Sequence, residues 1–257
     1  MRLTRSLEPD TDNTGVGSLC YNTLVYTVLP PILFRRHYLF SDKGVTMKFN
    51  NKRTVILVES AVMVSMASIL SLIRIISLPY GGSVTLCCML PLVILSYRRG
   101  IRWGIGASLV FSVIQMILGM GTISAAFLPG EDQMVLYKAI LMVILDYFIA
   151  YSFVGFSGIV HKGSPSKCLC IGSIIGCTAR YIAHFLSGFI LWGSYAEWFF
   201  EDQMSNNISK WILQHFSGNG LAAIYSLIYN GSYMIPEIII TSFAAYIIGK
   251  IPQISNK

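Results

Sequence analysis

Arg180, His184 and Trp192 lie within one apolar stretch and form the first chemically informative pattern of the chain. Residues four apart share a helix face, and Trp192, eight residues beyond His184, falls on much the same side. An ionisable side chain in hydrocarbon costs several kcal/mol, about 2.5–3.5 on insertion scales, so it faces a protein interior or a water-filled cavity. A cation, an imidazole and an indole in one column therefore predict the wall of a polar pocket inside a membrane protein.

A carboxylate, Asp146, lies beside Tyr147 in a second apolar stretch. One interpretation is that Asp146 pairs with a cation such as Arg180 only to satisfy its burial. The other is that it meets a cationic or amino-bearing ligand. Because an unpaired carboxylate in a membrane span is expensive, we favour the ligand.

The last apolar stretch is unusually polar, with Tyr225 and Tyr229 one turn apart and Asn230 following. Asn230 stands about 140° round a helix from Tyr225, so a shared site needs a local irregularity such as Gly231 and Pro236 could supply. Helix–helix hydrogen bonding explains each polar residue about as well as ligand contact does. Glu237 has two possible roles, as a structural partner or as a proton carrier, and the sequence favours neither.

The composition assigns the chain to the integral membrane proteins. Hydrophobic residues make up 54% and charged residues only 12%, whereas soluble domains carry about 25% charge. The six cysteines lack His or Cys partners at zinc spacing, so we expect buried free thiols and no metal. The sequence has no Gly-x-x-x-x-Gly-Lys-Ser/Thr phosphate loop, so the chain hydrolyses no ATP itself.

Hydropathy predicts an all-α integral membrane protein with six transmembrane helices, over residues 54–73, 84–97, 103–120, 138–160, 168–192 and 221–248. The second is short against the roughly 20 residues of a span. The last is long enough to tilt, or to bend at Pro236.

Basic residues gather in alternate connections of the six-helix region: Lys48, Lys52, Arg53, Arg98, Arg99, Arg102, Lys162, Lys167, Lys250 and Lys257. The other connections hold the acids Glu131, Asp132, Glu197, Glu201 and Asp202, with only the basic residues Arg74, Lys138 and Lys210 nearby. The positive-inside rule then places both ends of the region in the cytoplasm. The two long outer loops, about 120–137 and 193–219, could cover an outward-facing site.

Residues 1–46 differ from the rest, since their one apolar run, 19–33, is short and broken by Pro30 and Pro31. We interpret them as an N-terminal extension outside the 47–257 membrane domain. Met47, followed by basic residues and an apolar helix, is a candidate native start.

Two weaker patterns have alternative explanations. Ala61 and Ser65 are small residues four apart, which let helices approach closely; internal packing is slightly favoured over partner docking on pattern alone. Ser157 with His161 or His184 could suggest an intramembrane serine hydrolase, but Ser157 belongs near the cytoplasmic end of its helix and His184 in the outer half of the next.

Six stretches in chain order carry a family resemblance: Gly81-Gly-Ser-Val-Thr-Leu-Cys-Cys-Met-Leu-Pro91, Ser96-Tyr-Arg-Arg-Gly-Ile-Arg-Trp-Gly104, Leu145-Asp-Tyr147, Arg180-x-x-x-His184, Trp192-Gly-Ser-Tyr-Ala196 and Tyr225-Ser-Leu-Ile-Tyr-Asn-Gly231. Together, over about residues 50–250, the chain resembles the thiamine-specific substrate-binding (S) components of energy-coupling factor (ECF) transporters, the ThiT/YuaJ family.

The resemblance implies a set of substrate-binding residues: Asp146, Tyr147, Arg180, His184, Trp192, Tyr225 and Asn230, with Tyr80 and Tyr137 as further aromatic candidates. Relatives usually carry Glu where Asp146 stands and often Lys where Arg180 stands, which preserves charge and changes distances. His184 and Asn230 would hydrogen-bond the pyrimidine or the hydroxyethyl end of thiamine, and Arg180 would neutralise or orient Asp146.

The same resemblance implies a function in the bacterial cell membrane. The chain would capture thiamine from outside, with no cofactor and no enzymatic activity, and act with a transmembrane coupling subunit and two cytosolic ATPases. Ala61 and Ser65 would then dock on the coupling subunit. The alternative is a solo, proton-coupled thiamine carrier that uses Glu237 or Asp146; the intramembrane hydrolase is a distant third.

Overall fold

The computed structural model describes residues 52–78, 82–130 and 133–252. The predicted N-terminal extension, the candidate start at Met47 and the candidate Tyr80 lie outside the described residues. The described chain is almost entirely helical, so the all-α membrane fold predicted from hydropathy is confirmed.

The helices follow one another as α2 (Lys52–Leu72), α3 (Leu90–Arg99), α4 (Ile101–Leu118), α5 (Met120–Phe127), α6 (Leu136–Met142), α7 (Ala150–Val154), α8 (Pro165–Leu191), α9 (Ala196–Trp198), α10 (Asn207–His215) and α11 (Gly218–Ile248). Short segments of π-helix and 3₁₀-helix connect some of them: η3 (Val143–Ile149), η4 (Gly155–Ile159), η5 (Gly193–Tyr195) and η6 (Phe199–Gln203). Five described segments are long and apolar enough to cross a membrane, namely α2, α4, Leu136–Ile159, α8 and α11.

The second predicted span, 84–97, differs from the prediction. Its first residues belong to a strand, Cys87 has a φ of 55°, and the helix α3 that follows has only 10 residues. At 1.5 Å per residue α3 is about 15 Å long, half of a typical hydrocarbon core. Leu92, Val93 and Leu95 are fully buried, so the apolar run reflects packing inside the protein rather than contact with lipid.

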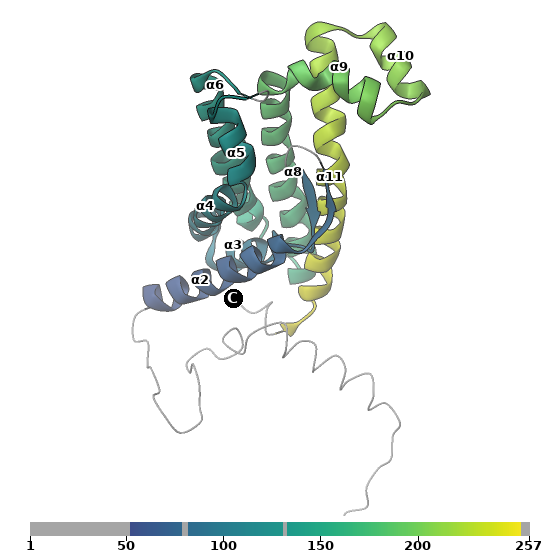
Figure 1. Ribbon diagram of the computed structural model, residues 1–257. Helices are drawn as coiled ribbons and strands as arrows, with labels where there is room; N and C mark the ends of the chain where they lie inside the picture. Colours follow the sequence, from purple (N-terminus) through teal and green to yellow (C-terminus); the bar gives the residue numbers. More distant parts are fainter. Residues whose placement is uncertain (1–51, 79–81, 131–132, 253–257) are drawn as a thin grey trace, which may run out of the picture. The chain divides into compact units, whose positions relative to one another are not determined.

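A two-stranded antiparallel hairpin connects α2 to α3, with β1 (Arg74–Ser77) paired to β2 (Ser83–Thr85). Val84 of β2 packs on Tyr233 and Met234 of α11, and Figure 1 shows both strands against this helix. Glu237 of α11 fixes the end of β2, because its carboxylate accepts hydrogen bonds from the Thr85 amide at 2.8 Å and hydroxyl at 2.7 Å.

The two longest helices, α8 and α11, run side by side, with α8 in the middle of the bundle and α11 at one side of it (Figure 1). They approach closely at Gly188, where a Cβ would lie 2.8 Å from the Asn230 amide nitrogen. Ser226 strengthens this contact by donating to the Phe185 carbonyl at 2.6 Å. This interface sets the position of the polar residues described below.

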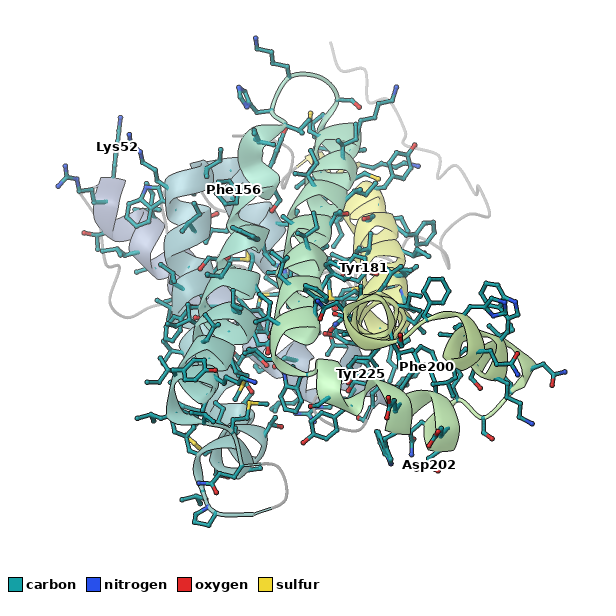
Figure 2. All side chains as sticks on the ribbon, turned by 90° about the horizontal axis from the view of Figure 1, so that it is seen from above. Lys52, Phe156, Tyr181, Phe200, Asp202 and Tyr225 are labelled. Carbon is teal, nitrogen blue, oxygen red and sulfur yellow. The ribbon has the colours of Figure 1, made fainter. Side chains whose placement is uncertain are left out.

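The long loop predicted over 193–219 is folded rather than extended. It contains α9 and α10, and an Asn206–Ser209 capping box begins α10. Phe200 and Ile212 bury themselves against Tyr225 of α11. Seen from above in Figure 2, Phe200 and Tyr225 lie close together beside α11, while Asp202 lies at the outer edge. This segment therefore packs on the first turns of α11.

Candidate substrate-binding site

A cavity of about 120 Å³ lies between the hairpin, α5, the Leu136–Ile159 segment, α8 and α11. Arg180, His184 and Gly188 of α8 follow one another at four-residue spacing, so one helix face forms one wall. The remaining lining residues are Gly82, Ser83, Thr122, Met142, Asp146, Tyr147, Tyr151, Trp192, Tyr225, Tyr229, Asn230 and Tyr233.

The structure brings seven of the nine residues predicted from sequence to this one cavity: Asp146, Tyr147, Arg180, His184, Trp192, Tyr225 and Asn230. Tyr137 does not join them; its side chain is 65% exposed on α6. Tyr80 lies outside the described residues, although Gly82 and Ser83, which follow it closely in sequence, line the cavity. Ligand contact by each residue stays a prediction.

A hydrogen-bonded chain organises the polar wall. The Arg180 Nε lies 3.3 Å from His184 Nε2, His184 Nδ1 lies 3.0 Å from Asp146 Oδ1, and Ser187 donates to Asp146 Oδ2 at 2.7 Å. Arginine has no acceptor, so His184 Nε2 accepts and its Nδ1 carries the proton that it donates to Asp146. His184 is therefore a neutral tautomer, and each oxygen of Asp146 has a hydrogen-bond partner.

The proposed direct pairing of Arg180 with Asp146 is not what the structure shows. His184 lies between them, and among the described residues it is His184, not Arg180, that hydrogen-bonds Asp146. The Asp146 side chain is 20% exposed, so its carboxyl group is open to the cavity. Arg180 instead lies 4.4 Å above the Tyr151 ring and donates to the Tyr151 hydroxyl at 3.3 Å.

Asp146 and Tyr147 belong to η3, a π-helical turn inside the segment from Leu136 to Ile159. Such turns insert an extra residue into an α-helix and occur frequently at functional sites. The wider turn changes which side chains face α8. Tyr147 reaches the cavity from the same turn, and its ring lies against Gly119, where a Cβ would approach the ring to 3.1 Å.

Aromatic rings form another part of the lining. The ring centroids of Tyr225 and Tyr229 are 5.7 Å apart, and Phe199 lies edge-on to both at 5.3 and 5.9 Å. Trp192 lies at the end of α8 with its ring 5.6 Å from that of Tyr195. Flat faces in this arrangement suit a planar or cationic ligand.

Asn230 lines the cavity and also joins α11 to α8. Its Nδ2 donates to the His184 carbonyl at 3.2 Å and to the Ser226 carbonyl at 3.0 Å, and its Oδ1 accepts from the Tyr233 hydroxyl at 2.7 Å. α11 stays helical through this region, so no break is needed to bring Asn230 and Tyr225 to one cavity. Both interpretations of Asn230, helix packing and cavity lining, apply at once.

Sequence reasoning missed Tyr151, Ser187 and Tyr233, which bind Arg180, Asp146 and Asn230 respectively. Helical spacing could have indicated that two of them share a helix face with predicted site residues, because Tyr151 follows Tyr147 by four residues and Ser187 follows His184 by three.

The residues of the distant hydrolase alternative do not meet. Ser157 donates to the Val154 carbonyl and packs against Gly172 and Gly176 of α8. Gly176 is eight residues from His184, which is about 12 Å along a helix. Among the described contacts, Ser157 therefore has no histidine to activate it.

Comparison with known proteins agrees with this architecture. A family model described as "Thiamine transporter protein (Thia_YuaJ)" matches residues 57–199. The chain is similar to the thiamine transporter ThiT of Bacillus subtilis, at 30% identity over 203 residues covering 74% of this chain and 88% of the relative. It is also similar to ThiT of Lacticaseibacillus paracasei, at 29% identity over 164 residues covering 57% and 72% respectively.

A solved structure of ThiT from Listeria monocytogenes matches with a TM-score of 0.57 and 24% identity, and covers 78% of this chain and 96% of that one. This match supports the fold. The family match spans more than half of the chain, and the relatives carry the name of transporters rather than enzymes. The chain therefore belongs to the thiamine transporter protein (Thia_YuaJ) family and is a multi-pass membrane transport protein, not an enzyme.

Proposed function

We propose that the chain captures thiamine in the cavity between α8 and α11 and is the substrate-binding subunit of an ECF-type transporter. The observation that carries the proposal is that the Asp146 carboxyl group and a group of aromatic rings line one cavity. Thiamine combines a flat aminopyrimidine with a permanently cationic thiazolium. Desolvated cation–π contacts contribute about 2 kcal/mol or more each, and an ionised carboxylate forms stronger hydrogen bonds than a neutral acceptor.

Each wall of the cavity then has a role. Asp146 attracts the cation or accepts from the amino group, while Trp192, Tyr225 and Tyr229 stack on the two rings. Both nitrogens of His184 already have partners, so we propose that His184 positions Asp146 rather than binding thiamine through its ring.

Thiamine binding to the purified chain, followed by intrinsic tryptophan fluorescence, tests the site. We expect saturable quenching that Asp146→Asn and Trp192→Ala both weaken. Tyr137→Ala is the matched control, because Tyr137 is exposed and does not line the cavity, and it should bind as the parent chain does. A well-folded parent chain that binds no thiamine would remove the assignment.

Coupling to a larger transporter is the second part of the proposal. The sequence holds no phosphate loop, so energy from ATP would come from separate ATPase subunits. On α2, Ala61 and Ser65 are exposed on one face with Leu57 and Ile69. Ser65 donates to the Ala61 carbonyl at 2.8 Å, so its hydroxyl is satisfied within the helix and the face can pack against an apolar helix. We propose this face as the docking surface for the coupling subunit.

Uptake measurements separate this role from that of a solo carrier. If the chain needs its partners, thiamine uptake disappears when the ATPase subunits are removed. Uptake that persists without them and collapses with a protonophore would instead indicate proton coupling through Asp146 or Glu237.

We propose that both ends of the described region face the cytoplasm of a bacterial cell. The support is the positive-inside rule, applied to basic residues such as Arg99 and Lys162. A cysteine placed at Lys162 should resist a membrane-impermeant thiol reagent in intact cells, whereas one placed at Glu197 should react. The opposite pattern would reverse the orientation.

A further inference from the structure

A second cavity, of about 180 Å³, adjoins the first and belongs to no role assigned above. Ser83, Thr122, Tyr147, Tyr151 and Arg180 line both, so the two spaces share one wall. The residues that line only the second cavity are Ser71, Arg74, Thr85, Cys88, Gln115, Leu118, Gly119, Gly121 and Glu237. Its lining is rich in hydrogen-bond donors.

Arg180 is a buried cation with no carboxylate beside it. It is 7% exposed, and its recorded partners are neutral: His184 Nε2 and the hydroxyl and ring of Tyr151. No carboxylate among the described residues lies within 4.0 Å of its nitrogens. A buried charge is costly unless it is paired, and among the described residues the guanidinium has no carboxylate in direct contact; Glu237, which lines the same cavity, acts on it only from beyond contact distance.

A second cation lines the same cavity. The side chain of Arg74 in β1 forms no recorded ion pair or hydrogen bond with the described residues, and its exposed position gives solvent ions access. Glu237 does not neutralise either arginine by direct contact, because its two oxygens accept from Thr85 and its side chain is 2% exposed. The Gln115 amide donates one hydrogen to Ser71 and keeps a second for the cavity.

From this geometry we propose that the second cavity binds a small inorganic anion, such as chloride or phosphate, between Arg74 and Arg180. The proposal also has a consequence for the first cavity, and this consequence rests on the proposed function. A cationic ligand beside Arg180 is repelled by its charge, and an anion held against Arg180 in the second cavity offsets that repulsion. Anion and thiamine therefore bind cooperatively.

The first experiment needs no thiamine. The melting temperature of the purified full chain is measured in detergent at constant ionic strength, while the bulky anion gluconate is replaced by chloride or by inorganic phosphate. We expect a saturable rise in melting temperature with at least one of the two small anions.

Three variants test whether Arg74 binds the anion. Arg74→Gln should abolish the rise in melting temperature, Arg74→Lys should keep part of it, and Lys210→Gln should leave it intact. Lys210 is an exposed residue of α10 that lines neither cavity, so it controls for loss of one positive charge. An equal response of the parent and Arg74→Gln chains, or no response to either anion, would overturn the site.

The second experiment measures the coupling. Thiamine titrations in gluconate and in the stabilising anion should differ in affinity by about fivefold or more, in the range of ordinary coupling between sites. Arg74→Gln should show one affinity in both salts. Weaker thiamine binding in the small anion would mean competition and would overturn cooperativity. A chain that binds no thiamine in any salt would end the proposed function, while the melting experiment would still decide the anion site.

Discussion

The close approach of α8 and α11 at Gly188 makes a quantitative prediction for Gly188→Ala. The added Cβ would meet Ser226 and would lie 2.8 Å from the Asn230 amide nitrogen. Neither neighbour can move freely, since Ser226 donates to the Phe185 carbonyl and Asn230 to the His184 carbonyl. Overpacking of this kind costs about 1–3 kcal/mol.

A glycine without neighbours supplies the control. At Gly106 of α4 an added Cβ would have no neighbouring atom within 4 Å, so Gly106→Ala gains only the helix propensity of alanine, about 1 kcal/mol. Gly188→Ala gains the same propensity and also incurs the cost of overpacking. The difference between the two variants is therefore the overpacking cost alone.

Thermal unfolding in detergent measures this difference. At about 2–4 °C per kcal/mol for a domain of this size, Gly188→Ala should melt about 2–12 °C below Gly106→Ala. Because Gly188 also lines the cavity, thiamine affinity should fall about tenfold in Gly188→Ala, which is about 1.4 kcal/mol, and stay unchanged in Gly106→Ala. Equal melting temperatures for the two variants would refute the argument that these helices touch too closely for a side chain.

Three further predictions concern other contacts. Glu237→Gln places an amide against the two donors of Thr85, so we expect a loss of about 1–3 kcal/mol in thermal unfolding, and an unchanged melting point would argue against the anchoring of β2. Ser65→Trp fills the exposed face of α2, so uptake in cells should be lost while thiamine binding to the purified chain persists; full uptake would argue against docking there. Glu59→Gln leaves Arg98 and Arg99 without their carboxylate, which should cost about 3 kcal/mol in the same melting assay, and a neutral effect would show that this cluster does not hold α2 to α3.

Much of the site follows from periodicity alone. The four-residue spacing of Arg180 and His184 places them on one face of any helix, and α8 keeps that face toward the cavity. The partners of these residues do not follow from it. Nothing in the spacing indicates that His184, rather than Arg180, contacts Asp146, because that depends on the π-helical turn that carries Asp146.

The fold shows where hydropathy is ambiguous. A run of apolar residues indicates only that the segment is shielded from water. Burial inside a protein and exposure to lipid both produce such a run. Residues 84–97 resemble a span for this reason, although α3 is buried from Leu90 to Tyr97. The short strands β1 and β2 carried no alternating pattern long enough to predict them, and their pairing depends on the support of α11.

The shortness of α3 has a consequence for how the chain enters the membrane. A segment of about 15 Å that begins in non-helical backbone cannot leave the insertion machinery as an independent span, since its free amides and carbonyls would face lipid. It has to be accommodated together with neighbouring helices that cover it, including α2 and α4. The first third of the described chain is therefore expected to enter the bilayer as one cooperative unit: a nascent chain stalled just after α3 should keep the segment from Ser83 to Arg99 outside the hydrocarbon core, and one stalled after α4 should not.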